Sequence, residues 1–185
     1  MCRIHFTHGA AEDIRTLADD RASPMALACW KGHLAICEWL YEVGAAEDIS
    51  KVDNAGHTPM NLACWGGHAS VCEWLFKVGA AEDISKADNA GDIPMHQACG
   101  YGHLSLCEWL LKVGAAEHTR KANDRGHTPM TLACWGGHLS VCEWLFKMGA
   151  TEDISKANNK GITPMLMACW KGHLSVCEWL FKVGA

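Results

Sequence analysis

Long hydrophobic runs and an excess of basic charge are both missing from this 185-residue chain. No apolar stretch approaches the roughly 20 residues that a membrane-spanning helix needs, and residues 1–17 lack the basic start and apolar centre of a signal peptide. We therefore expect no membrane partner and a cytoplasmic location. Lys and Arg number 16 against 21 Asp and Glu, for a formal net charge of -5. Nucleic acid, whose phosphates select basic surfaces, is therefore not an expected partner.

Proline is scarce, with five copies, and those copies are evenly spaced. Each lies 35 residues from the next, as does a Gly-His pair that follows each proline eight residues later. Self-similarity at a fixed period of this length is typical of stacked repeats. The prolines are Pro24, Pro59, Pro94, Pro129 and Pro164.

One repeat reads as two short helices joined by a tight reversal. Thr58 is a good N-cap, and Pro59 occupies the first helical position, where its missing N–H costs no hydrogen bond. Gly67 and His68 predict the reversal, and a second amphipathic helix follows. Its apolar stripe at i, i+3, i+4 and i+7 is Val71, Trp74, Leu75 and Val78. Such a unit is too small to bury its own apolar face, so we expect it to stack on its copies.

These motifs, T-P-M-x-L-A-C, then G-H, then V-C-E-W-L-F-K-V-G-A, resemble the ankyrin repeat over the whole chain. The resemblance implies an all-α ankyrin-repeat solenoid of stacked helix-turn-helix units with extended, β-hairpin-like fingers. In the family, a His after Thr-Pro-Leu locks the first turn to the Thr hydroxyl. Only His96 keeps that His, and its repeat has Ile93 in place of the Thr. No repeat therefore predicts the complete local lock.

We interpret the chain as one domain, 1–185. It opens with a half repeat, 1–17, and continues with repeats 18–52, 53–87, 88–122, 123–157 and 158–185. The repeat 88–122 diverges most, because Gly100-Tyr101 replaces the Trp65-Gly66 of the repeat 53–87. The last repeat carries no polar cap, so its apolar face should be exposed. We therefore expect a fragment of a longer array, with end-to-end self-association through the terminal repeats.

The eleven cysteines form two columns at the same period, with Cys2 extending the second. Stacked repeats place members of one column on the order of 10 Å apart, which is too far for a disulfide. Pairing within a repeat stays open, but we predict free, buried thiols in a reducing compartment. Cys64, His68 and Cys72 offer only three zinc ligands and lack a C-x2-4-C knuckle, so we predict no metal and no cofactor. The columns are Cys29, Cys64, Cys99, Cys134 and Cys169, then Cys37, Cys72, Cys107, Cys142 and Cys177.

Function follows from what is repeated and what varies. Catalysis needs one convergent constellation, whereas the polar residues of this chain recur in every repeat, so we predict no enzyme. The resemblance implies a protein–protein interaction module that binds a partner through the concave face and finger tips. The alternative is a structural or spacer fragment of a longer ankyrin array with no partner of its own. Near-identity between repeats favours the spacer, and variation confined to one face favours the binding module.

The predicted partner-binding surface lies on one flank of the first helices. A nearly constant aromatic column should be partly exposed beside a column that differs in every repeat, with the finger tips as its edge. The aromatic column comprises Trp30, Trp65, Tyr101, Trp135 and Trp170. The variable column comprises Ala26, Asn61, His96, Thr131 and Leu166, and the finger edge comprises His57, Asp92, His127 and Ile162. A second Trp column in the second helices should be buried: Trp39, Trp74, Trp109, Trp144 and Trp179.

Overall fold

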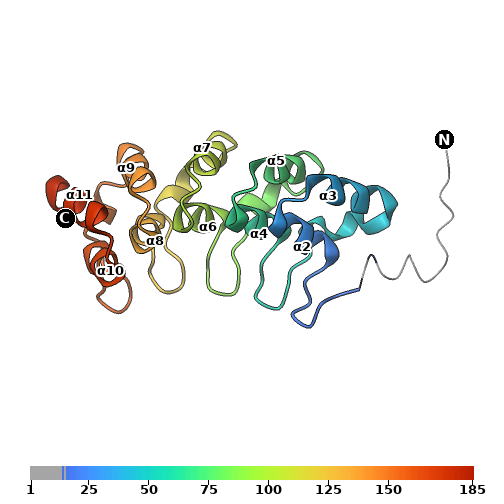
Figure 1. Cartoon of the computed structure of the whole chain (residues 1–185), viewed down its shortest axis with the longest axis horizontal. Helices are drawn as coiled ribbons and strands as arrows, with labels where there is room; N and C mark the ends of the chain where they lie inside the picture. The colour runs from blue at the N-terminus through green and yellow to red at the C-terminus, as the bar shows by residue number, and fades with distance from the viewer. Residues whose placement is uncertain (1–13, 15) are drawn as a thin grey trace.

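A computed structural model describes residue 14 and residues 16–185, which form paired helices in a gently arched row (Figure 1). Cys2 and almost all of the predicted half repeat 1–17 lie outside the described residues. The first helices are α2 (Pro24–Lys31), α4 (Pro59–Gly66), α6 (Pro94–Gly100), α8 (Pro129–Gly136) and α10 (Pro164–Lys171). The second helices are α3 (Leu34–Leu40), α5 (Ala69–Lys77), α7 (Leu104–Lys112), α9 (Leu139–Lys147) and α11 (Leu174–Val183).

The helices form two layers that run along the row. Each first helix packs against the first helix of the next repeat, and each second helix packs against the next second helix. The first-helix layer is the more closely packed of the two. The fingers project from the side of the first helices, at the bottom of Figure 1, and the second helices line the opposite side. This arrangement confirms the predicted all-α solenoid.

Four of the five described first helices, all except α6, begin at a Ser or Thr cap and end at a left-handed glycine, as their sequences predict. The hydroxyl of Thr58 accepts a hydrogen bond from the backbone N–H of Asn61 at 3.1 Å, and the hydroxyl of Ser23 does the same for Ala26. Pro59 then occupies the first helical position. At the other end, Gly137 follows α8 in the left-handed conformation with a φ of 77°. A Cβ there would lie 2.5 Å from the His173 ring of the next repeat, so both the backbone and the neighbour require glycine.

The hydrogen bond that locks the first turn of the helix is made in the repeats 53–87 and 88–122, although neither repeat has the complete Thr-Pro-Leu-His motif. Asn61 Oδ1 accepts hydrogen bonds from the Thr58 N–H at 3.0 Å and from its hydroxyl at 2.7 Å. His96 Nδ1 accepts from the Ile93 N–H at 3.1 Å, which replaces the missing hydroxyl with a backbone donor. Each side chain also reaches the following connector, since Asn61 Nδ2 donates to the Lys86 carbonyl and His96 Nε2 donates to the Lys121 carbonyl.

The conserved geometry of the Gly-His reversal links one repeat to the one before it. His68 Nε2 donates to the Trp30 carbonyl at 3.0 Å, and His103 does the same to the Trp65 carbonyl. The imidazole of His68 is therefore committed to the backbone of the preceding repeat, which accounts for a histidine at this position without a metal ion.

The connectors between repeats begin with short 3-10 helices: η2 (Ala46–Ser50), η3 (Ala81–Ser85), η4 (Ala116–Thr119) and η5 (Glu152–Ile154). A π-helical turn, η1 (Tyr41–Ala45), precedes the first of them. Each finger then closes by turn hydrogen bonds, as where the Asp53 N–H donates to the His57 carbonyl at 3.2 Å. The structure contains no strand within the described residues, so the hairpin-like character expected of the fingers is not confirmed.

The core runs between the two helix layers and is continuous along the row. Met60, Met95 and Met130 of successive first helices are fully buried in it. The two cysteine columns meet inside each repeat as free thiols, with sulfur–sulfur distances of 3.6 Å for Cys64 and Cys72 and 3.4 Å for Cys99 and Cys107. Burial raises the pKa of the Cys64 thiol, and its hydrogen bond with Cys72 adds to this. Within the described residues, no helix is long and apolar enough to cross a membrane.

Candidate functional site

The predicted aromatic column does form a partly exposed row along the first helices. Trp30, Trp65 and Trp135 are half-buried, Tyr101 is 47% exposed and Trp170 is 72% exposed. We call these five side chains the aromatic ladder. The four tryptophans lie near the C-terminal ends of their helices, and Tyr101 directly follows the last residue of α6.

Three of the four neighbouring pairs in the aromatic ladder are in ring contact, and Tyr101 and Trp135 are the exception. Trp30 and Trp65 have centroids 6.0 Å apart, and Trp65 and Tyr101 stack at 5.4 Å with 27° between their planes. Trp135 and Trp170 meet edge to face at 5.6 Å. Such pairs stabilise by about 0.5–1.5 kcal/mol beyond the area they bury. The aromatic ladder is therefore a preorganised surface of rigid side chains.

The variable column does not belong to that surface. Asn61, His96 and Thr131 are fully buried and Ala26 is 1% exposed, so the prediction that this column faces a partner was wrong for four of its five members. Their side chains point into the interface between repeats, where Asn61 and His96 make the lock described above. Leu166 is 54% exposed, because no later repeat covers it within the chain. Asn61, His96 and Thr131 make the local bond with different groups, whereas Ala26 and Leu166 have no polar side-chain atom to make it.

The finger edge is half-buried, and its side chains bridge successive fingers. His57 Nδ1 lies 2.9 Å from an Asp53 oxygen of its own finger, and its Nε2 lies 3.3 Å from Asp88 of the next finger. Asp92 Oδ1 accepts a hydrogen bond from Asn123 Nδ2 at 2.7 Å. This bond joins the next pair of fingers through a carboxylate and an amide in place of the imidazole and carboxylate. The His57 ring also meets Trp65 edge to face, at a centroid distance of 5.8 Å.

The two remaining finger-edge residues complete the pattern towards the C-terminus. His127 Nε2 accepts from Asn158 Nδ2 at 2.7 Å, and burial lowers the pKa of His127, which fits an accepting neutral imidazole. Burial also raises the pKa of the Asp92 carboxyl, because it disfavours the charged form. Ile162 makes no such bridge and lines a cavity instead. These edge residues therefore hold the fingers in register and border the aromatic ladder.

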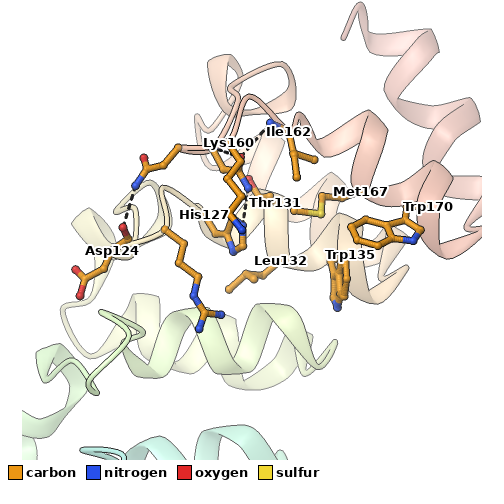
Figure 2. A pocket seen from close by; sticks show the side chains of 12 residues that line it. Asp124, His127, Thr131, Leu132, Trp135, Lys160, Ile162, Met167 and Trp170 are labelled. Atoms are coloured by element: carbon orange, nitrogen blue, oxygen red, sulfur yellow. Dashed lines mark hydrogen bonds between the residues drawn. The ribbon is translucent and has the colours of Figure 1, made fainter.

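A cavity of about 590 Å³ lies where the last two fingers meet the aromatic ladder. Figure 2 shows Trp135 and Trp170 side by side at one end of it, with Leu132 and Met167 as apolar walls. His127, Lys160 and Ile162 line its finger end. Its volume falls within the range of small-ligand and side-chain pockets, about 300–1,000 Å³.

The second Trp column is less buried than predicted. Trp144 is 9% exposed, but Trp39 is 45% exposed and Trp74, Trp109 and Trp179 are half-buried. Trp74, Trp109 and Trp179 each meet an aromatic ring of the preceding repeat by an edge and are not enclosed. Phe76 and Trp109, for example, meet at 5.9 Å with 83° between their planes.

Sequence reasoning missed the residues that shape the cavities. The sequence analysis singled out neither Leu132 nor Met167, and the structure places both in the cavity lining beside Trp135 and Trp170. Lys31 and Lys171 lie over the Trp30 and Trp135 rings at 3.9 and 4.1 Å, respectively. The one feature of the sequence that could have indicated a cavity is Gly100, because the other four repeats carry a tryptophan at this position.

Comparison with known families agrees with this geometry. A family model described as "Ankyrin repeats (3 copies)" matches residues 2–88 and 95–185. No curated protein matches the chain. The match covers nearly the whole sequence and coincides with the helix pairs, the capped prolines and the Gly-His reversals seen in the structure. The chain belongs to the ankyrin repeat family.

Proposed function

We propose that this chain is a protein-binding module whose partner lies along the aromatic ladder and the finger edge. The aromatic ladder carries this proposal, because it keeps five aromatic side chains partly exposed in one row while Met60, Met95 and Met130 of the same helices are buried. Trp and Tyr are over-represented among the residues that dominate binding energies at protein interfaces. Ankyrin repeats are, as a family, protein-interaction modules, which supports the same conclusion.

The cavity beside Trp135 and Trp170 gives the partner a place to anchor. It combines apolar walls with a few polar groups at one end, among them Lys160, which is typical of sites that bind one side chain or a small molecule. The finger bridges hold this edge in place before a partner arrives, so little ordering is needed on binding. We infer a non-catalytic role in a reducing compartment such as the cytosol, in line with five pairs of free thiols.

Affinity capture with the purified 1–185 chain tests this proposal. Trp65→Ala and Trp135→Ala truncate two rungs of the aromatic ladder, and Glu73→Ala and Glu108→Ala are matched controls on the exposed face of the second helices. We expect partners that bind the unmodified chain and both control variants but bind the Trp variants at least tenfold more weakly, measured afterwards by calorimetry with the identified partner.

Two results would contradict the proposal. Proteins captured equally by the Trp variants would place binding elsewhere on the chain. Capture of nothing above background, from lysates of several sources, would favour the alternative that this chain is a structural spacer with no partner of its own. Melting temperatures of the four variants must be compared first, so that a loss of fold is not read as a loss of binding.

We also propose end-to-end self-association, on a separate observation. Trp170, Leu174 and Phe181 of the last repeat are 72%, 69% and 82% exposed. In the preceding repeat, Phe146 is covered by Trp179 at 5.8 Å, and a second copy would offer its half-exposed Trp39 to Phe181 in the same way. Sedimentation equilibrium should show mass rising with concentration, and Phe181→Lys should suppress that rise. A concentration-independent monomer mass would exclude it.

A further inference from the structure

The aromatic ladder is interrupted at one place. Four repeats carry Trp at the same position, whereas the repeat 88–122 carries Gly100. Tyr101, one residue later, stacks back onto Trp65 and so extends the first part of the aromatic ladder. Trp135 begins the second part, in contact with Trp170. The structure thus leaves a gap between Tyr101 and Trp135 at the position where every other repeat places an indole.

The side chain beneath this gap is uncovered as a result. In the repeat 53–87, Leu62 is 6% exposed because Trp30 of the preceding repeat and its own Trp65 pack around it. Leu132 holds the same position two repeats later, but Gly100 stands where its covering Trp would be. Leu132 is half-buried rather than buried. The missing side chain at Gly100 therefore leaves Leu132 partly uncovered.

A cavity of about 500 Å³ occupies the gap, and we call it the Gly100 slot. Tyr101 and Trp135 form its two aromatic walls, and Gly100 and Leu132 lie between them. Asp92 and Lys171 line its polar rim. The Asp92 carboxylate already accepts a hydrogen bond from Asn123, and the Lys171 ammonium lies 4.1 Å from the centre of the Trp135 ring.

We propose that the Gly100 slot binds the indole of a tryptophan side chain from the partner protein. The chain itself supplies the template, because the Trp30 side chain packs on Leu62 at the corresponding place in the repeat 53–87. The rim gives a cationic side chain no net electrostatic advantage, because the charges of Asp92 and Lys171 oppose each other and Lys171 already covers the Trp135 ring. This assignment rests on the proposed function and names the anchor that the partner inserts.

The substitution Gly100→Trp tests the assignment by filling the slot from within. It restores the residue of the other four repeats, and a Cβ at Gly100 would meet its nearest neighbour, Leu132 Cβ, at 3.4 Å, which is ordinary contact. The variant should therefore fold, with a melting temperature equal to or above that of the unmodified chain. Ser105→Trp, on the exposed face of α7, adds the same side chain away from the slot and is the matched control.

Binding is measured with N-acetyl-L-tryptophanamide as the probe, titrated into the isotope-labelled 1–185 chain and followed by NMR. We expect millimolar binding with shift changes centred on the Gly100 amide and the Leu132 methyl groups. Gly100→Trp should weaken it at least tenfold, and Ser105→Trp should leave it unchanged. N-acetyl-trimethyllysine amide at the same concentrations should bind more weakly than the tryptophan probe.

Three outcomes would overturn the assignment: no binding up to the solubility limit of the probe, equal binding by Gly100→Trp, or preference for the trimethyllysine probe. The capture experiment separates this proposal from the broader one. A partner lost with Trp135→Ala but retained by Gly100→Trp would sustain the aromatic ladder as the binding surface and reject the slot as its anchor. If the tryptophan probe binds at the Gly100 slot but no partner is captured, the slot is an indole-binding site and the proposed protein-binding function is contradicted.

Discussion

The repeats 123–157 and 158–185 are close in sequence but differ in how much of their surface is buried. Cys134 is fully buried, whereas Cys169, its counterpart in the last repeat, is exposed. Phe146 is half-buried under Trp179, whereas Phe181 is 82% exposed. The same side chains on the same helices thus gain or lose burial according to whether a further repeat packs against them. In this fold, much of a repeat's stability comes from its neighbour.

Thiol reactivity should show this difference most strongly. Cys169 is exposed in the folded chain, while Cys134 becomes accessible only when the interior opens, at a cost of several kcal/mol. Since about 1.4 kcal/mol changes a population tenfold, Cys134 should be alkylated on the order of 10³-fold more slowly. Mass spectrometry of proteolytic peptides after timed labelling measures both rates. Equal rates in the native protein would break the comparison, and equal rates in denaturant are the control.

Truncation of apolar side chains should follow the same division. Leu145 is fully buried between repeats, so Leu145→Ala should lower the free energy of unfolding by about 2–5 kcal/mol through lost burial and a cavity. At protein concentrations where the chain is monomeric, Phe181→Ala removes a larger side chain but one that is 82% exposed, and should change stability by about 0.5 kcal/mol or less. Urea denaturation of the two variants measures this. A large loss for Phe181→Ala that grows with protein concentration would instead indicate the end-to-end contact.

The sequence was a good guide to the backbone and a poorer guide to what side chains meet across repeats. Period, caps and reversals follow from local rules, so the helix boundaries could be read from residues such as Thr58, Pro59 and Gly67. Asn61 and Thr131 were misplaced on the surface, because their burial depends on the connector and finger of the adjacent repeat. The same limit hid the Gly100 slot, since a missing Trp becomes a cavity only once Leu132 of the next repeat lies beneath it.

Asn61 and His96 make the same hydrogen bond to the start of their helices, but only the His96 side chain can gain a proton near neutral pH. The stability of the chain should therefore depend on pH through His96 and not through Asn61. Burial lowers the pKa of His96 to about 4, although the hydrogen bond that its Nε2 donates to the Lys121 carbonyl favours the protonated ring. As pH falls below about 6.5, the His96 side chain takes up a proton in the unfolded chain but stays neutral in the folded chain. Stability is therefore complete above about pH 6.5 and declines as pH falls towards 4, by up to about 3 kcal/mol.

His96→Asn sharpens that comparison, because it installs the side chain that the repeat 53–87 uses at the same place. Unfolding free energies of both proteins between pH 7 and pH 4 should diverge, with the unmodified chain losing more. The remaining ionisable groups are the same in both proteins, so the difference between the two curves reports on His96. Parallel curves would show that His96 does not carry the acid sensitivity.

The smallest expected effect isolates the neighbour by itself, because Gly137 and Gly172 share one backbone conformation. Each glycine follows a first helix and has a φ of 77°, so alanine at either position should destabilise the fold by the same left-handed backbone strain, about 1–2 kcal/mol. A Cβ at Gly137 would in addition lie 2.5 Å from the His173 ring, whereas one at Gly172 would meet nothing within 4 Å. Gly137→Ala should therefore displace His173 and weaken its hydrogen bond to the Trp135 carbonyl.

That hydrogen bond is partly buried, and loosening it should cost about 1 kcal/mol beyond the shared strain. Chemical denaturation of the two variants gives the difference directly, and His173→Ala should abolish most of it by removing the ring that the new methyl group meets. If Gly137→Ala and Gly172→Ala prove equally destabilising, the contact between successive reversals contributes nothing, and the difference between an interior and a terminal repeat must come from apolar burial alone.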